Sequence, residues 1–330
     1  MKKIYEAFFA DCDNQGGVYR YALMEDGSLQ LRSKLQLERP MYLELHGKNL
    51  YTIVRPEDTT KESGFLKVVL QDDGSMVREG EILSTLGFCA CHLTVDATET
   101  DAYAVNYLSG SAVKFPDTLV THQGKSLHPT RQEAAHAHQI IFTPDQKYLA
   151  VNDLGMDRIF LYDRDLNEVS VTKAPAGAGP RHTAFSLDGK LAYVLNELTS
   201  DVSVYRYEEG KLEYLASYSA LPADFRGRNT AAAIRVSPDG KMLYTSNRGH
   251  DSIACFLIEG EGLKLLTTVP SGGAEPRDFN LTPDGKFLIA TNQVGKNVTV
   301  FRMEEGIPVP TGEVVPMISP LAVVFGEVTE

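Results

Sequence analysis

Short apolar runs alternate with polar turns along most of the chain, and one arrangement of them recurs. It consists of an apolar run, a turn similar to Pro-Asp-Gly, a run in which apolar residues alternate, and an asparagine followed by one more polar residue. This arrangement occupies residues 138–153, 181–197, 232–248 and 277–293. Asp-Gly suits a tight turn, and alternation with period two suits a half-buried strand. Each copy therefore predicts two antiparallel strands joined by a turn.

The asparagine that closes each copy recurs at a regular spacing of 44 to 51 residues. The markers are Asn106, Asn152, Asn196, Asn247 and Asn292. A third apolar run follows four of them, at 158–163, 202–207, 252–258 and 298–303, and a fourth run is clear at 212–218 and 263–269. A repeat of roughly 40–50 residues with four strands in each unit is typical of a propeller blade.

Weaker copies and the two chain ends complete the ring. Residues 41–55 and 91–107 fit blades two and three. Residues 3–10 fit a second strand that lacks a first, and 320–325 fit a first strand that lacks a second. The chain is therefore predicted to be all-β, a seven-bladed β-propeller of four-stranded antiparallel blades, closed by the C-terminal strand (about 320–325) in the N-terminal blade. This closure leaves no open gap in the ring. Residues 1–330 are expected to form a single domain.

Composition narrows the partners. The chain has 330 residues, 43% hydrophobic and 23% charged, and a formal net charge of −12. An acidic protein is not expected to bind nucleic acid, which needs a basic surface. The N-terminal apolar stretch is too short for a signal sequence or a membrane span, so we expect a cytoplasmic protein that does not bind membranes. Cys12, Cys89, Cys91 and Cys255 are expected to be reduced thiols, without a metal.

Polar residues gather where the first strand of each pair begins and the second ends. These positions lie beside each other in an antiparallel pair, and in a propeller they form one rim of the central channel. The residues there are His138, Arg181, Arg277, Asp153, Glu197, Arg248 and Gln293, with Arg55 from blade two and Tyr107 from blade three. Arginines crowded on one rim repel one another unless they hold an anion. Arginine binds phosphate or carboxylate through two hydrogen bonds, and an ionised carboxylate can take a proton from water.

Several of these residues also have a purely structural interpretation. Glu197 could pair with Arg181 only to join two strands, and Arg248 could pair with Asp251. Arg55 precedes Pro56 in a degenerate blade, which favours exposure in a loop. His136, His182 and His250 fit loops or turns, and the marker asparagines fit turns capped by side-chain to backbone hydrogen bonds. The longest irregular stretch, roughly 121–137, is expected to be either functional or mobile.

The repeats resemble a known family. The segments at 136–163, 179–197, 237–256 and 275–293 are similar to those of the seven-bladed lactonase family, which includes cycloisomerase-type 6-phosphogluconolactonases and fungal carboxymuconate lactonizing enzymes. The resemblance extends from about residue 40 to the C-terminus. It implies functional roles for His138, Arg181, Arg248 and Glu197, and also for Arg277. The chain departs from the family at 7–10, where Ala-Phe-Phe-Ala replaces Gly-Thr-Tyr-Thr.

The resemblance implies hydrolysis of a small anionic substrate, 6-phospho-D-glucono-1,5-lactone. Glu197 or His138 would take a proton from the attacking water, and Arg181 would stabilise the oxyanion. Substrate binding is assigned to Arg248, Arg277, Gln293 and Asp153, and no metal or cofactor is expected. Two other functions stay open: lactonization of a muconate-type diacid at the same site, and a binding scaffold without catalysis. The scaffold predicts a flat rim of mixed charge, and the oligomeric state stays open.

Overall fold

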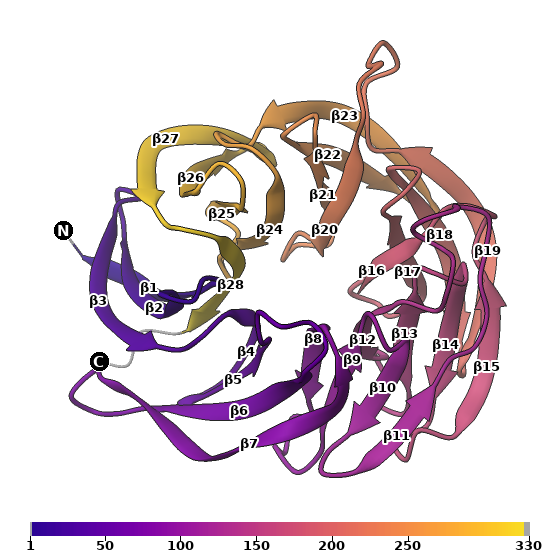
Figure 1. Cartoon of the computed structure of the whole chain (residues 1–330). Coiled ribbons are helices and arrows are strands. Elements are labelled where there is room, and N and C mark those ends of the chain that lie inside the picture. Colours follow the sequence, from indigo (N-terminus) through magenta and orange to yellow (C-terminus); the bar gives the residue numbers. More distant parts are fainter. Residues whose placement is uncertain (1, 327–330) are drawn as a thin grey trace.

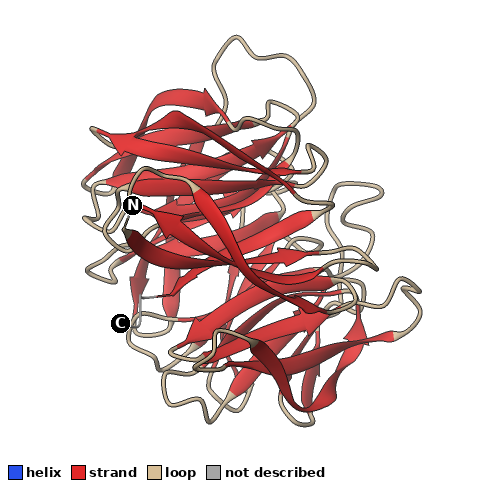
Figure 2. Cartoon of the chain, turned by 90° about the vertical axis from the view of Figure 1, so that its left-hand side faces the viewer, coloured by secondary structure: helices blue, strands red, loops and turns tan. Residues whose placement is uncertain are grey.

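Seven four-stranded antiparallel sheets stand around a central axis in the computed structural model, which describes residues 2–326 (Figure 1). All regular secondary structure in these residues is β-strand. Figure 2 views the ring from its side and shows the strands between two faces covered by loops. The prediction of a seven-bladed β-propeller is confirmed. No helix in the described part of the chain is long and apolar enough to cross a membrane.

The first three blades contain the N-terminal third of the chain and its last strand. Blade one consists of β28 (Pro320–Gly326), β1 (Lys3–Asp11), β2 (Gly17–Met24) and β3 (Leu29–Gln36). Blade two consists of β4 (Pro40–His46), β5 (Asn49–Val54), β6 (Glu62–Leu70) and β7 (Met76–Phe88). Blade three consists of β8 (Ala90–Val95), β9 (Ala102–Asn106), β10 (Ser111–Lys114) and β11 (Thr118–Thr121). These are the weaker copies of the repeat.

The remaining four blades follow the clear repeats. Blade four consists of β12 (Ala137–Phe142), β13 (Leu149–Asp153), β14 (Arg158–Tyr162) and β15 (Glu168–Lys173). Blade five consists of β16 (Pro180–Phe185), β17 (Leu191–Asn196), β18 (Asp201–Glu208) and β19 (Lys211–Ser219). Blade six consists of β20 (Thr230–Val236), β21 (Met242–Arg248), β22 (Ser252–Glu259) and β23 (Gly262–Pro270). Blade seven consists of β24 (Pro276–Leu281), β25 (Phe287–Asn292), β26 (Asn297–Glu304) and β27 (Ile307–Pro316).

The ring closes in blade one, where the two ends of the chain share a sheet. Strand β28 is antiparallel to β1, with Ala7 opposite Phe325 and Ala10 opposite Ala322. The buried carboxylate of Asp11 accepts a hydrogen bond of 2.6 Å from the backbone N–H of Ser319. The predicted closure by the C-terminal strand is confirmed, and the ring has no open sheet edge between the chain ends.

The hydrophobic core of the described residues is divided among the seven interfaces between neighbouring blades, with one cluster in each. Between blades five and six, for example, Tyr193 and Leu195 pack in one cluster with Leu243 and Phe256. The second strand of a blade is covered on both faces, so β17 and β25 are buried along their whole length. Buried apolar area on both faces of each sheet stabilises the ring and holds the inner strands in place.

The pairing register places the Asp-Gly turns and the marker asparagines at opposite faces of the ring. In blade five, Pro180 lies opposite Asn196 and Phe185 lies opposite Ala192, so the Asp-Gly turn is far from the rim where the asparagine lies. In the turn of blade six, Asp239 accepts hydrogen bonds from Ser237 and from the backbone N–H of Lys241. Gly240 there has a φ of 72°, which glycine adopts without strain. These turns only reverse the chain.

The marker asparagines are structural. Their side-chain amides donate hydrogen bonds to backbone carbonyls in three blades: Asn106 to Thr85, Asn247 to Ala220 and Asn292 to Ser271. In blades four and five, Asn152 and Asn196 donate to side chains instead. All five asparagines are buried. Side-chain to backbone bonds thus exist at three of the five, but they reach carbonyls 21 to 27 residues earlier in the chain and do not cap local turns as expected.

Candidate active site

A cavity of about 350 Å³ lies at the rim where the first strands begin. Blades two to seven contribute its wall: Arg55, Cys91, Tyr107, Arg131, His138, Glu197, Arg248 and Arg277. Each of these residues stands at or next to the end of a strand or in the segment between two blades. The ring brings together residues that are far apart in the sequence, and the rim predicted from the repeats is a concave polar site.

Glu197 lies at the centre of an ion network on this wall. Its Oε2 is 3.0 Å from Nε of Arg181 and 3.1 Å from Nη2 of Arg248. Its Oε1 accepts a hydrogen bond from Nη2 of Arg131, which also donates to the Tyr107 hydroxyl over 3.3 Å. Arg248 therefore pairs with Glu197 and does not pair with Asp251. The pairing of Glu197 with Arg181 also exists, but it is one part of a larger network.

Glu197 is ionised in this setting. Burial opposes the charged form of the carboxyl group, but attraction to Arg248, Arg181 and Arg131 outweighs it and holds the pKa of Glu197 well below its usual range. A carboxylate with so low a pKa is a poor proton acceptor near neutral pH. It is well suited to hold arginine side chains in fixed positions.

The stability of the fold should depend on pH through Glu197. Its pKa is lower in the folded than in the unfolded chain. The stabilisation is therefore fully present above the ordinary glutamate pKa of about 4.3 and is lost as the pH falls from there toward the folded pKa. Urea unfolding of the wild type and of Glu197→Gln between pH 7 and pH 3 measures this. The difference in free energy of unfolding should shrink as the pH falls, and a constant difference would contradict the assignment.

Arg181 lies behind Glu197 and does not line the cavity. Its Nη1 donates to the backbone carbonyl of Ala232 and lies 3.2 Å from Nε2 of His182. Burial and repulsion from Arg248 lower the pKa of Arg181 to about 9, so it still carries its charge at neutral pH. From this position Arg181 can orient Glu197. It was expected on the cavity wall in contact with the oxyanion, and it does not lie there.

His138 is the cavity residue best suited to accept a proton. It is buried at the start of β12, and burial together with repulsion from Arg181 lowers its pKa well below 6.5, so the imidazole is neutral. Within the described residues its Nδ1 has no hydrogen-bond partner. The ring stands edge-on to Tyr107, with centroids 5.8 Å apart. It also faces His182 at 5.2 Å.

His182 was expected in a loop or turn, and this was wrong. It is buried inside strand β16, where its ring contacts those of His138 and His92. Pro180 and His182 flank an irregularity in the pairing of β16 with β17. The sequence pattern could not reveal this, because a polar residue near the start of an inner strand can face a neighbouring blade or the central channel.

Arg55 and Arg277 are the two arginines of the cavity wall without a carboxylate partner among residues 2–326. Burial and repulsion from Arg248 lower the pKa of Arg277 to about 10. Arg55 follows β5 outside any strand, as expected, but the expectation that it is exposed was wrong, because it is half-buried on the wall. Four wall arginines face one carboxylate, so the cavity carries a positive excess that an anionic ligand would neutralise.

Besides Arg181, two more residues expected at the rim do not line the cavity. The carboxylate of Asp153 is fully buried, 2.6 Å from Nδ1 of His122, and it accepts the backbone N–H groups of His136 and Met156. Gln293 is next to Arg277, with its Oε1 3.5 Å from Nη1 of that arginine, and does not line the cavity. The end of a strand fixes where a residue lies, but neighbouring groups decide where its side chain points. Asp153 holds the 122–136 segment, and Gln293 supports Arg277.

Arg131 is the charged wall residue that sequence reasoning missed. It belongs to the irregular stretch 121–137, whose length alone suggested a role. Asp157 helps to hold this stretch in place. It accepts a hydrogen bond of 2.7 Å from Nε2 of Gln132, within the stretch, and one of the same length from the backbone N–H of Gly179, outside it.

Cys91 also lies on the wall, and burial raises the pKa of its thiol to about 12. The described residues contain no group of three or more His, Cys, Asp or Glu side chains placed to hold a metal ion.

Comparisons with known proteins agree with the fold. A family model described as lactonase, seven-bladed beta-propeller, matches residues 5–325. An uncharacterized protein of Staphylococcus aureus is 36% identical over 309 residues, which cover 87% of this chain and 89% of the relative. The structure of a Pseudomonas aeruginosa periplasmic gluconolactonase superposes with a TM-score of 0.91, at 25% identity and over 99% of this chain and 100% of the other. A putative 6-phosphogluconolactonase of Bacteroides uniformis gives 0.90 at 27% identity, over 98% of this chain and 100% of the other.

Proposed function

Because the chain belongs to the lactonase family of seven-bladed β-propellers, we propose that it is a hydrolase that opens the ring of an anionic sugar lactone. The proposed substrate is 6-phospho-D-glucono-1,5-lactone. The structural similarity to a gluconolactonase and to a putative 6-phosphogluconolactonase supports a sugar lactone. The positive excess of the cavity supports a phosphorylated one.

One observation carries the proposal: a neutral imidazole and an excess of guanidinium groups share the same concave site. His138 offers a proton acceptor, and Arg55, Arg131, Arg248 and Arg277 offer positive charge. The alternative of a binding scaffold predicts a flat rim of mixed charge, and the arginine-lined cavity does not fit it. Hydrolysis of a lactone needs both a proton acceptor for water and positive charge for the developing oxyanion.

The proposed reaction uses His138 as the base. A water oxygen attacks the lactone carbonyl while His138 takes one proton from that water. The carbonyl oxygen becomes an oxyanion, which Arg248 stabilises from the wall beside Glu197. The bond from the carbonyl carbon to the ring oxygen then breaks, and the imidazolium returns the proton to the leaving alkoxide. The products are a carboxylic acid and a hydroxyl group on the opened chain, and the acid loses its proton to solvent.

The other charged residues bind and orient. Arg277 and Arg55, which have no carboxylate partner in the described structure, bind the phosphate. Glu197 stays ionised and keeps Arg131 and Arg248 in place, with Arg181 supporting it from behind. The choice between Glu197 and His138 as the base falls on His138, because arginines engage both carboxylate oxygens of Glu197, whereas no such partner holds the imidazole of His138 on the cavity wall in the described structure.

Arg277→Ala tests the phosphate site. A lost charged hydrogen bond costs about 1.5–3 kcal/mol, so kcat/KM for 6-phosphogluconolactone should fall by roughly 10–100-fold. Hydrolysis of unphosphorylated gluconolactone should change much less. Both rates are measured with spontaneous hydrolysis subtracted. Arg206→Ala is the control, because Arg206 pairs with the exposed Glu213 and Glu261 and does not line the cavity.

Equal losses on both lactones would remove Arg277 from phosphate binding. Absence of any activity of the wild type on either lactone would contradict the proposed hydrolysis. A muconate-type diacid is assayed in parallel to test the lactonizing alternative. Turnover of the diacid, together with no turnover of either lactone, would favour that alternative.

A further inference from the structure

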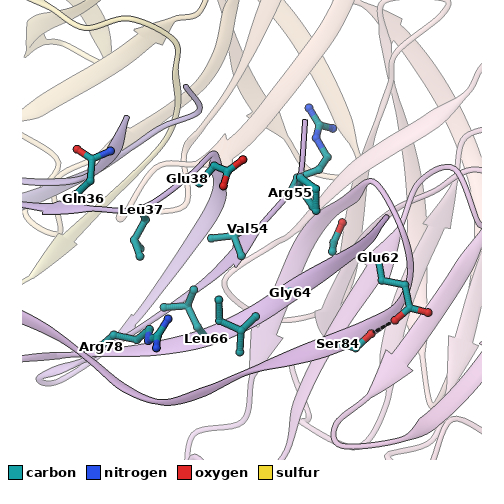
Figure 3. Close-up of a pocket in the computed structure, with 13 residues that line it drawn as sticks. Gln36, Leu37, Glu38, Val54, Arg55, Glu62, Gly64, Leu66, Arg78 and Ser84 are labelled. Carbon is teal, nitrogen blue, oxygen red and sulfur yellow. Dashed lines mark hydrogen bonds between the residues drawn. The ribbon is translucent and has the colours of Figure 1, made fainter. Parts of the chain in front are cut away.

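A second hollow of about 500 Å³ adjoins the cavity and lies between blades one and two. We call it the inter-blade groove. Leu37, which follows β3, belongs to one side, and Val54 of β5 and Leu66 of β6 belong to the other (Figure 3). Ile82 of β7 also lines the groove. Its size falls in the range of small-molecule sites, and its lining is largely apolar, as such sites usually are.

Arg55 connects the two hollows, because it lines both of them. In Figure 3 its side chain extends away from Val54 and Leu66. The guanidinium can thus serve the cavity while the base of the side chain borders the groove. The hollows differ in chemistry: arginines, a glutamate and a histidine line the cavity, whereas the groove has four aliphatic side chains beside polar ones that include Glu38, Glu62 and Arg78. Together they form a site with a strongly charged end and an end whose surface is more apolar than polar.

The floor of the inter-blade groove depends on a glycine. A Cβ atom at Gly64 would lie 2.2 Å from Cγ2 of Ile82 and 3.2 Å from Cγ2 of Val54. Ile82 can therefore lie across β6 only because position 64 has no side chain. Ile82 remains 45% exposed, so it presents apolar surface to the groove and to solvent. Polar groups are also present, where Ser84 donates a hydrogen bond to Glu62 (Figure 3).

We propose that the inter-blade groove binds an apolar arm of the same substrate whose anionic part binds in the cavity. The inference rests on the proposed function and narrows its substrate class to anionic lactones that carry an aliphatic or similarly apolar substituent. The ring and its anionic group occupy the cavity, and the arm passes Arg55 and covers Ile82, Val54 and Leu66. Each methylene removed from water on this path strengthens binding, and the arginines hold the charged end.

Simple alkyl phosphates test the groove without catalysis. Methyl phosphate supplies only the charged head, and hexyl phosphate adds an apolar arm. Titration calorimetry should give a Kd for hexyl phosphate at least about tenfold lower than for methyl phosphate, since burial of several methylenes accounts for this factor. In Ile82→Asp the advantage of the longer chain should disappear while methyl phosphate binds as before. Leu37→Ser, on the other side of the groove, should reduce the advantage in the same way.

Val77→Asp is the matched control. Val77 is 50% exposed on the same strand, β7, and does not line the groove, so this variant should keep the full advantage of hexyl phosphate. Equal affinities for the two phosphates in the wild type would overturn the proposal, as would an advantage that survives in Ile82→Asp. A different result would contradict the proposed function alone: the protein binds both phosphates but hydrolyses no lactone. Failure of both phosphates to bind would count against the groove and the phosphate site together.

Discussion

Replacing His138 by glutamine is expected to lower kcat/KM for the lactone by about 10²–10⁴-fold, the usual contribution of a positioned general base. Glutamine approximates the size of histidine but cannot take a proton from water. The wild-type profile of kcat/KM against pH should fall on the acid side through the pKa of His138. That limb should lie below pH 6.5, because burial and repulsion from Arg181 lower this pKa in the free protein. The variant should lack the limb.

His250→Gln is the control for this experiment. His250 lies in the turn after β21, outside the cavity, and its Nδ1 is 2.7 Å from the Ser252 hydroxyl. It should leave both the rate and the pH profile unchanged. An acid limb that persists in His138→Gln, with a rate near that of the wild type, would assign the base to another group.

Replacing Glu197 by glutamine is expected to have the largest effect on stability. Removing one partner of a buried ion pair costs about 3–5 kcal/mol, because the remaining charge stays buried without compensation. Here Arg181, Arg131 and Arg248 would all lose their shared carboxylate. The free energy of unfolding in urea at pH 7 should fall by this amount. Activity should also fall, because the arginines on the wall lose their orientation.

Inorganic phosphate separates this explanation from general damage to the fold. If uncompensated arginines cause the instability, phosphate should stabilise Glu197→Gln by binding to them, as mass action requires. Glu213→Gln, which removes an exposed partner of Arg206, should change stability by less than about 1 kcal/mol. A Glu197→Gln protein as stable as the wild type would show that the network has little energetic role.

The strands were predictable from sequence because each blade repeats the same local code. An Asp-Gly turn between two apolar runs sets the register, as in blade six around Asp239 and Gly240. Blade two lacks that turn, yet its strands form where they were predicted, at β4 and β5. The closure of the ring was also predictable, since 3–10 and 320–325 each lacked the partner that the other supplies.

The site was predictable only in part. The repeat places His138, Glu197, Arg248 and Arg277 at the same end of their blades, and the structure brings these four into one cavity. Asp153 follows the same rule of position, yet its carboxylate turns to His122 and away from the cavity. Arg131 obeys no repeat and reaches Glu197 from an irregular segment. The inter-blade groove had no sequence signal, because its wall comes from two different blades.

The sequence by itself determined the ring and the end of each blade at which polar residues gather, because turn chemistry and alternation act between residues that are near in the chain. Only the tertiary structure decided which side chains face the cavity. The direction of Arg181, Asp153 and Arg131 depends on partners that other blades or long loops supply: the backbone carbonyl of Ala232 for Arg181, His122 for Asp153 and Glu197 for Arg131. Those contacts join residues tens of positions apart, and a local pattern carries no record of them.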